Sequence, residues 1–316
     1  MTDYHVAIFG GGSVGLCLAA SFATAGARVS LLVRKGAMRD LEDGPVTVSG
    51  ALGDHAIAPG TIAIVDAANP DDDVLSCDML ILTTKAYDVQ AALEPFAGRA
   101  RSLSVLLMQN GIGTAEIARS VLGPTVPVYS TAMMIGMVRV APNAAEISGH
   151  AGPVQCGPML GDDIGPLNKL LDVAAQGFVP MTYDRAIRET ISFKLLLNSC
   201  MNPTGALTGQ TYGELLENPA SRALIVGLAD ETLAAFARAF DYRPAQSGQH
   251  YVDEILSAIV SKGGGKHRSS MLQDLQSGRK TEIAFLNGFI IGLAQDHGLS
   301  AVRHDVVRQL IMARET

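Results

Sequence analysis

Residues 5–15 read HVAIFGGGSVG, an apolar run of five residues that leads directly into a glycine-rich turn. Gly10, Gly12 and Gly15 match the pattern G-x-G-x-x-G, and an apolar face typical of a helix follows them. The first glycine permits a tight turn, the second lets a pyrophosphate approach the backbone, and the third allows helix and strand to pack closely. The helix N-terminus adds partial positive charge. We therefore predict a dinucleotide site here, the alternative being a glycine turn with a structural role alone. The residues expected to contact the dinucleotide are Gly10, Gly12, Ser13, Val14 and Gly15.

The end of the next predicted strand, residues 29–33, indicates which dinucleotide is bound. An acidic side chain there would accept a hydrogen bond from a ribose 2′-hydroxyl, but the chain continues Arg34-Lys35-Gly36. Arginine is suited to bidentate contact with phosphate. The sequence therefore favours NADP over NAD, with Arg34 on the 2′-phosphate. The alternative is that Arg34 and Lys35 are ordinary solvated surface residues.

The first half of the chain alternates short apolar runs with helical or turn-rich stretches, which predicts βαβ units and a parallel sheet. Around residues 141–157 the pattern changes to short extended segments with glycine and proline, which indicates antiparallel additions at a sheet edge. The predicted parallel strands are residues 5–9, 29–33, 79–83, 105–108 and 126–130.

Long amphipathic helices dominate from residue 185 onward. We therefore expect an α/β protein in which a Rossmann-type doubly wound sheet, residues 1–184, precedes an all-α domain, residues 185–316. The glycine-rich stretch at residues 262–266 is either a flexible connector or a loop that faces a ligand. The predicted helices are residues 187–207, 219–240, 251–260, 281–297 and 303–314.

The composition excludes several classes of protein. The 316 residues are 48% hydrophobic and 17% charged, which excludes long-range disorder. A net charge of −7 argues against a nucleic-acid partner. No apolar run reaches the ~18 residues of a membrane helix, and no signal peptide precedes the first strand. Four scattered cysteines indicate a reducing compartment, so we expect a cytoplasmic protein, and the histidines show no metal-ligand spacing.

A polar stripe marks the first helix of the second half. Lys194, Asn198 and Asn202 are spaced four residues apart among apolar neighbours, so they share one helix face. That face either lines a cavity or is solvated. A lysine among apolar residues can have a lowered pKa and act as a general acid, and carboxamides can donate and accept around a substrate. Asn110 follows the strand at residues 105–108, at the sheet edge where open α/β sheets bind ligands.

At this point the chain resembles the ketopantoate reductase family, within the 6-phosphogluconate dehydrogenase-like superfamily, over nearly its whole length. The matching pieces follow in order: the glycine motif, TKAY at residues 84–87, QNG at 109–111, the lysine–asparagine stripe at 194–202, SSMLQD at 269–274 and TEI at 281–283. As a set in this order the pieces are highly specific, although each alone would not be.

The resemblance implies NADPH-dependent reduction of a 2-oxo acid to a 2-hydroxy acid, with 2-dehydropantoate (ketopantoate), the precursor of pantoate in pantothenate biosynthesis, as the favoured substrate. It assigns Lys194 as the general acid and places Ser270 on the substrate carboxylate and Glu282 on its distal hydroxyl. Alternatives are the same chemistry on another 2-oxo acid, or an NADP-sensing protein without turnover. A homodimer is compatible with the resemblance. The remaining residues that it assigns are Asn198 and Asn202, which contact substrate, and Asn110 and Lys85, which lie where cofactor and substrate meet.

One segment departs from the family pattern. Met133, Met134 and Met137 stand where family members carry polar residues, so the segment is either an apolar wall for a different or larger 2-oxo acid or an ordinary buried strand. His267, beside the serine pair, either touches substrate or is exposed.

Overall fold

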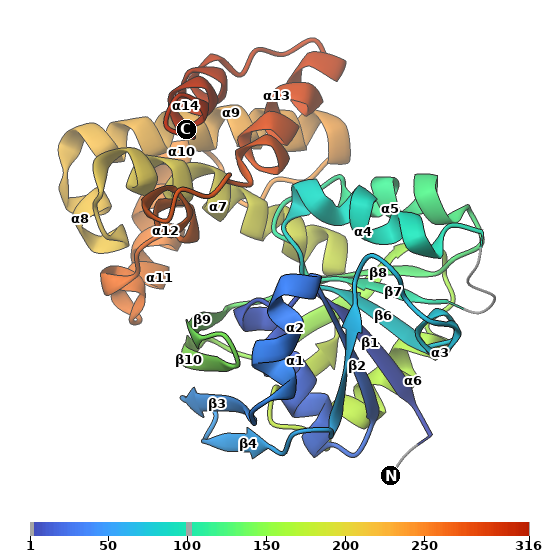
Figure 1. Cartoon of the computed structure of the whole chain (residues 1–316). Coiled ribbons are helices and arrows are strands. Elements are labelled where there is room, and N and C mark those ends of the chain that lie inside the picture. Colours follow the sequence, from blue (N-terminus) through green and yellow to red (C-terminus); the bar gives the residue numbers. More distant parts are fainter. Residues whose placement is uncertain (1–2, 99–102, 316) are drawn as a thin grey trace. The chain divides into compact units, whose positions relative to one another are not determined.

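The computed structural model describes residues 3–98 and 103–315, which form two compact units (Figure 1). The first unit holds the described residues up to Gln109 together with Thr114–Arg188. The second holds Asn110–Gly113 and the described residues from Glu189 onward. These bounds differ from a single division at residue 184, because the short segment Asn110–Gly113 is grouped with the second unit.

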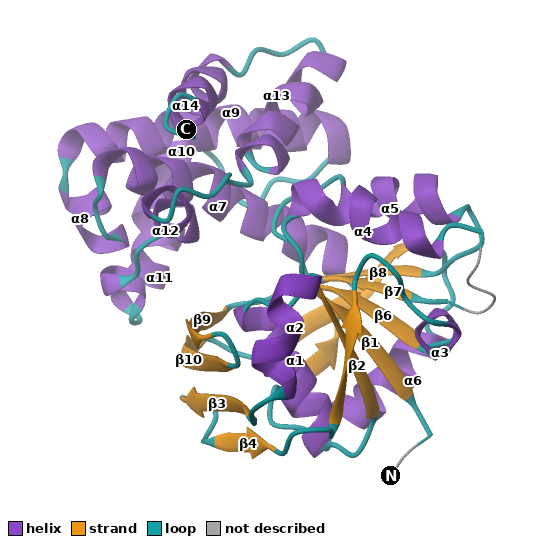
Figure 2. Cartoon of the chain, in the orientation of Figure 1, coloured by secondary structure: helices purple, strands orange, loops and turns teal. Residues whose placement is uncertain are grey.

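An eight-stranded sheet forms the centre of the first unit, with strand order β12-β11-β8-β7-β6-β1-β2-β5 (Figure 2). Neighbouring strands from β8 to β5 pair in parallel, whereas β11 pairs antiparallel with β8 and parallel with β12. The predicted parallel sheet is confirmed. The strands are β1 His5–Phe9, β2 Arg28–Val33, β5 Ile62–Asp66, β6 Met79–Leu82, β7 Val105–Leu107, β8 Val128–Ala132, β11 Val154–Leu160 and β12 Met181–Tyr183.

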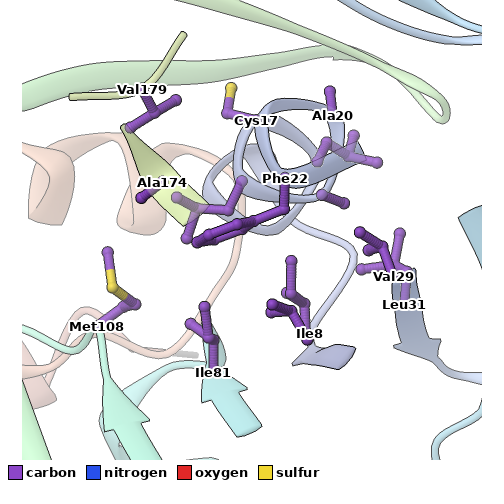
Figure 3. Close-up of a cluster of buried hydrophobic side chains, with 14 of the residues drawn as sticks. Ile8, Cys17, Ala20, Phe22, Val29, Leu31, Ile81, Met108, Ala174 and Val179 are labelled. Carbon is purple, nitrogen blue, oxygen red and sulfur yellow. The ribbon is translucent and has the colours of Figure 1, made fainter. Parts of the chain in front are cut away.

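Side-chain alternation along these strands builds a core on each face of the sheet. Ile8 and Ile81 face one core, where Phe22 of α1 lies between the helix and the strands (Figure 3). Ala7 and Leu80 face the opposite core. Because both faces are covered by helices, the inner strands β6 and β7 are buried and apolar at every position, which made them recognisable from sequence. Helices α1 Ser13–Thr24, α2 Lys35–Glu42 and α6 Gly165–Ala174 pack on the first face, and α3 Asp72–Leu75, α4 Val89–Leu93 and α5 Thr114–Leu122 on the second.

A second sheet, with strand order β4-β3-β10-β9, packs on the other side of α1. The helix is therefore covered on both sides, and every residue from Gly15 to Phe22 is buried. The expectation that residues 141–157 add antiparallel strands at a sheet edge is correct for β11, which pairs antiparallel with β8. It is wrong for one pairing of β10, which forms an antiparallel hairpin with β9 but pairs in parallel with β3, a strand about a hundred residues earlier that the sequence pattern did not reveal. The strands of this sheet are β3 Val46–Gly50, β4 His55–Ile57, β9 Ile135–Ala141 and β10 Ala144–His150.

The second unit is helical around one apolar core, as predicted. The expected helix at residues 281–297 is wrong at its start, because a short 3-10 turn at Ile283–Phe285 precedes the helix. The Thr281 hydroxyl accepts from the Ile283 N–H and so holds the chain in this turn. The helices are α7 Ile187–Thr208, α8 Tyr212–Glu217, α9 Pro219–Phe240, α10 Gly248–His250, a π-helical turn Tyr251–Leu256, α11 Ser257–Ser261, a 3-10 turn Gly264–Lys266, α12 Ser270–Gln276, α13 Asn287–Asp296 and α14 Val302–Met312.

Pro203 lies inside α7, yet the helix continues to Thr208. Proline has no N–H, so the carbonyl of Ser199, four residues earlier, loses its helical donor. The Asn287 side chain replaces that donor, with Nδ2 3.0 Å from the Ser199 oxygen. Asn287 is completely buried and its Nδ2 also lies 2.9 Å from the His304 ring. The buried carboxamide of Asn287 thus replaces the hydrogen bond that Pro203 cannot donate, and it links α13 to α7.

Candidate active site

The glycine motif forms the turn between β1 and α1. Gly10 has a φ of +122°, and a Cβ there would lie 2.7 Å from Thr83 Oγ1. A Cβ on Gly15 would lie 1.8 Å from the Gly10 carbonyl oxygen, so both positions exclude larger residues. Gly12 differs because a Cβ there would meet nothing within 4 Å. The backbone at Gly12 therefore faces open space, as a ligand that approaches the main chain requires.

The N-terminus of α1 is suited to an anion. Gly12 is its N-cap and has no side chain that could accept from the first-turn N–H groups. The first turn holds no acidic residue. Partial positive charge at this helix end is therefore open to a pyrophosphate, and the backbone of Ser13, Val14 and Gly15 lies at the same place.

Basic side chains lie near the end of β2. Arg34 is the N-cap of α2, its side chain is 90% exposed, and its Nη2 lies 4.0 Å from Asp88 Oδ2. Lys35 is the first residue of α2, and Lys85 precedes the 3-10 turn Ala86–Asp88 after β6. Arg34 can reach a phosphate at low cost, because an exposed ion pair at this distance contributes little.

Two buried polar atoms lie beyond the ends of β6 and β7. The Gln109 amide donates through Nε2 to the Leu82 and Thr84 carbonyl oxygens, at 2.8 and 3.0 Å. Its Oε1 and the hydroxyl oxygen of Thr84 are buried, and neither has a hydrogen-bond partner among the described residues. Buried polar groups are almost always paired, so these two atoms fit a site that a polar ligand completes. The sequence contained both residues in the family pieces but gave neither a role.

In the second unit, α7 carries the predicted polar stripe. Asn198 and Asn202 are 8% and 4% exposed, and Lys194 is half-buried, so the stripe is not a solvated surface. Burial lowers the pKa of Lys194 to about 8, and the negative charge of Glu282 opposes that shift. A lysine of this kind can release a proton near neutral pH.

One pocket in the second unit gathers four of the predicted site residues. Asn110, Asn202, Ser270 and Glu282 line it, and Asn110 Nδ2 donates to Glu282 Oε2 at 3.4 Å. Lys194 interacts electrostatically with Glu282, and Asn198 lies between Lys194 and Asn202 along α7. The other lining residues are Met271, Asp274 and Leu286.

The segment that brings Asn110 to this pocket, Asn110–Gly113, fits closely against the rest of the second unit. A Cβ on Gly111 would lie 2.3 Å from the Phe285 carbonyl oxygen, and the φ of Gly111 is +92°. The N–H of Ile112 donates to the same oxygen at 3.4 Å. Glycine is therefore required at position 111, and the contact fixes Asn110 beside the turn that carries Glu282.

The structure adds two side chains that the sequence did not single out, Asp274 and Tyr212. Asp274, 4% exposed, lies at the pocket and pairs with Arg279 at 3.0 Å. Its spacing of four residues from Ser270 on α12 was the available signal. Tyr212 donates to Asn202 Oδ1, and the ring of His267 lies edge-on to the Tyr212 ring, 4.8 Å between centroids.

The methionine segment divides between the core and the surface. Met133 and Met137 pack against the apolar core of the first unit, whereas the Met134 side chain is 43% exposed. Among the described residues, no group of three His, Cys, Asp or Glu side chains is arranged to hold a metal ion.

Comparison with known proteins identifies the family. Two models of one family match in order, "Ketopantoate reductase PanE/ApbA" over residues 6–161 and its C-terminal part over residues 186–315. The 2-dehydropantoate 2-reductase of Aquifex aeolicus is 27% identical over 312 residues, which cover 98% of this chain and 96% of that protein. The enzyme of the same name from Archaeoglobus fulgidus is 26% identical, with coverage of 100% and 99%.

Solved structures agree on the fold. A PanE/ApbA family ketopantoate reductase from Ralstonia eutropha has a TM-score of 0.83 at 24% identity, with 98% of each chain covered. A D-mandelate dehydrogenase crystallised with NADH and anilino(oxo)acetate has a TM-score of 0.85 at 20% identity and the same coverage. These structures share the fold of the chain, whereas the two family models, which together match residues 6–161 and 186–315, show its family. The chain belongs to the ketopantoate reductase family.

Proposed function

We propose that the protein is an NADPH-dependent reductase that converts 2-dehydropantoate to pantoate. The observation that carries the proposal is the half-buried Lys194. Burial lowers its pKa to about 8, and the negative charge of Glu282, which lines the pocket together with Asn110, Asn202, Ser270 and Asp274, opposes that shift. A binding protein without turnover needs no such proton donor. Residues 1–184 would then bind the dinucleotide and residues 185–316 the 2-oxo acid.

The proposed reaction uses Lys194 as the general acid. When bound, the reduced nicotinamide supplies a hydride to C2 of the oxo acid. The carbonyl electron pair moves to oxygen, Lys194 stabilises the developing negative charge and gives that oxygen a proton, and the neutral amine regains its proton from solvent. Asn198, one helical turn along α7, can donate to the same oxygen.

The pocket offers different groups to the two ends of the substrate. Ser270 and Asn202 can donate hydrogen bonds to a carboxylate, whereas Glu282 can only accept when ionised. A distal hydroxyl satisfies such an acceptor, and an alkyl group in its place leaves Glu282 without that bond. Sites built to bind a substrate hydroxyl discriminate strongly against analogues that lack it.

The substrate assignment is tested by comparing 2-dehydropantoate with 2-ketoisovalerate, which lacks the hydroxyl. We expect kcat/KM to favour 2-dehydropantoate by about 10²-fold or more, and Glu282→Ala to reduce the ratio mainly by slowing that substrate. A wild-type preference for the hydroxyl-free acid, or for a bulkier one, would contradict the assignment. An unchanged ratio in the variant would remove Glu282 from substrate recognition.

The cofactor preference rests on the first unit. The open backbone at Gly12, the uncapped N-terminus of α1 and the unpartnered atoms of Thr84 and Gln109 fit a dinucleotide. Arg34, exposed at the end of β2, favours a 2′-phosphate. Lys85 would contact the cofactor, and Asn110 would contact both the cofactor and the substrate.

The reaction is proposed for the cytoplasm. The four cysteines, Cys17, Cys77, Cys156 and Cys200, are all buried and free, which suits a reducing compartment. No helix among residues 3–98 and 103–315 is long and apolar enough to span a membrane.

A further inference from the structure

Tyr212 makes a buried contact with the proposed substrate site. It is the first residue of α8, and its hydroxyl donates to Asn202 Oδ1 at 2.6 Å. Tyr212 is 6% exposed and Asn202 is 4% exposed, so water does not compete for this bond. Burial raises the pKa of Tyr212, and the phenol therefore stays protonated and remains a donor.

The bond decides what Asn202 presents to the pocket. A carboxamide carries one acceptor oxygen and two N–H donors, and it can present either group when it rotates by half a turn. With Oδ1 engaged by Tyr212, the group left for a ligand is the donor Nδ2. In the opposite orientation Asn202 would present an oxygen, which repels a carboxylate.

Other contacts hold both Tyr212 and Asn202 in place. The backbone N–H of Tyr212 donates to the His267 carbonyl at 3.0 Å, and the His267 ring packs edge-on against the phenol. Thr211 caps α8 in a reciprocal pair of bonds with Glu214. The Ser269 hydroxyl donates to the Asn202 carbonyl oxygen at 3.1 Å. The hydroxyl therefore meets a carboxamide whose backbone is already fixed.

We propose that Tyr212 is a positioning residue that fixes the Asn202 carboxamide with its N–H groups toward the substrate carboxylate, an inference that rests on the proposed function. The pocket then has a donor end at Asn202 and an acceptor end at Glu282. Tyr212 sets the polarity of the donor end without touching the substrate, and it favours 2-oxo acids over uncharged carbonyl compounds.

The molecule provides a matched control. Tyr251 lies in the core of the same unit and is completely buried, but its hydroxyl has no hydrogen-bond partner among the described residues. Tyr251→Phe therefore removes the same atom from the same residue type without breaking a bond. Tyr212→Phe keeps the ring and its packing on His267 and removes only the donor.

The test is a double-mutant cycle of Tyr212→Phe and Asn202→Ala, with KM for the 2-oxo acid, kcat and the Kd of NADPH as readouts. We expect Tyr212→Phe to raise KM by about 10-fold or more, the loss of one charge-assisted hydrogen bond, with kcat changed less and the Kd of NADPH unchanged. In the Asn202→Ala background Tyr212→Phe should change KM by less than about 2-fold, because the carboxamide that Tyr212 positions is absent. Tyr251→Phe should match the wild type.

If Tyr212→Phe raised KM by the same factor in the wild-type and Asn202→Ala backgrounds, the proposal would be overturned, since Tyr212 would then act independently of Asn202. An unchanged KM for Tyr212→Phe in the wild-type background would overturn it as well. If the wild-type enzyme reduces a different 2-oxo acid, the proposed substrate fails, and the same cycle run with that acid decides the role of Tyr212 on its own. Reduction of no 2-oxo acid would overturn both proposals.

Discussion

The pH dependence of the reaction tests the role of Lys194 directly. Burial lowers the pKa of this amine from 10.5 to about 8. If the protonated amine is the general acid, the enzyme is active below the pKa and loses activity as pH rises through it. At pH 9 about one-tenth of the amine would keep its proton, whereas a lysine of ordinary pKa would remain almost fully protonated. We therefore expect kcat/KM for reduction to fall ~10-fold per pH unit above about pH 8.

Glu282→Gln supplies the second half of this prediction. The negative charge of Glu282 raises the pKa of Lys194 against the effect of burial. Removing the charge while keeping the side-chain shape should lower the pKa, so the decline in kcat/KM should begin at lower pH in the variant. Because kcat/KM reports ionisations of the free enzyme and free substrate, the comparison does not depend on which step limits kcat.

The assay follows NADPH oxidation from about pH 6 to about pH 10 at constant ionic strength. Lys169→Met is the control, because Lys169 is an exposed lysine of α6 in the other unit, and its profile should overlay the wild type. A wild-type profile that stays flat to pH 10 would refute the assignment of Lys194 as the acid. A shift to higher pH in Glu282→Gln would show that the electrostatic account of the pair has the wrong sign.

Three further outcomes are expected. Lys194→Ala should lower kcat by ~10²-fold or more while NADPH still binds, as measured by steady-state kinetics and cofactor titration; a change below about 3-fold would make Lys194 structural. The KM for NADPH should be lower than that for NADH, and Arg34→Ala should narrow the gap by about 10-fold; equal use of both cofactors by the wild type would exclude a 2′-phosphate contact. Burial lowers the pKa of His304 from 6.5 to about 4. Between about pH 6.5 and pH 4 the unfolded chain therefore binds a proton at this histidine that the folded protein does not bind, and the free energy of unfolding should fall as pH falls through that range. Urea unfolding should show a loss of ~2 kcal/mol from this group between pH 7 and pH 5, and His304→Gln should be less stable at pH 7 but depend less on pH in that range.

How far the sequence predicts the fold depends on burial. Strand β6, Met79–Leu82, is buried at all four positions and reads as an unbroken apolar run. Strand β5, Ile62–Asp66, lies at the sheet edge with only Ile62 fully buried, so its pattern is weak and the strand was not predicted. Strand β3 was missed because its partner β10 lies far along the chain. Local periodicity carries no information about such pairings.

The same limit applies to the candidate site. The spacing of Lys194, Asn198 and Asn202 is a property of one helix, so sequence alone placed all three on one face. The contact between Tyr212 and Asn202 crosses the end of α7 and the turn at Gly209, where φ is +72°. The sequence does not predict this contact, because the packing of α8 after the turn determines where the Tyr212 side chain points.

The grouping of Asn110–Gly113 with the second unit bears on how such chains can be recombined. The backbone passes from one unit to the other three times, so the two units are not successive modules on the gene. A chimaera that joins two relatives at residue 188 would leave Asn110 and Gly111 from one parent against Glu282 and Phe285 from the other. To exchange the helical unit between family members, residues 110–113 must therefore be transferred together with it. A chimaera made to change substrate specificity without these four residues would have an incomplete pocket.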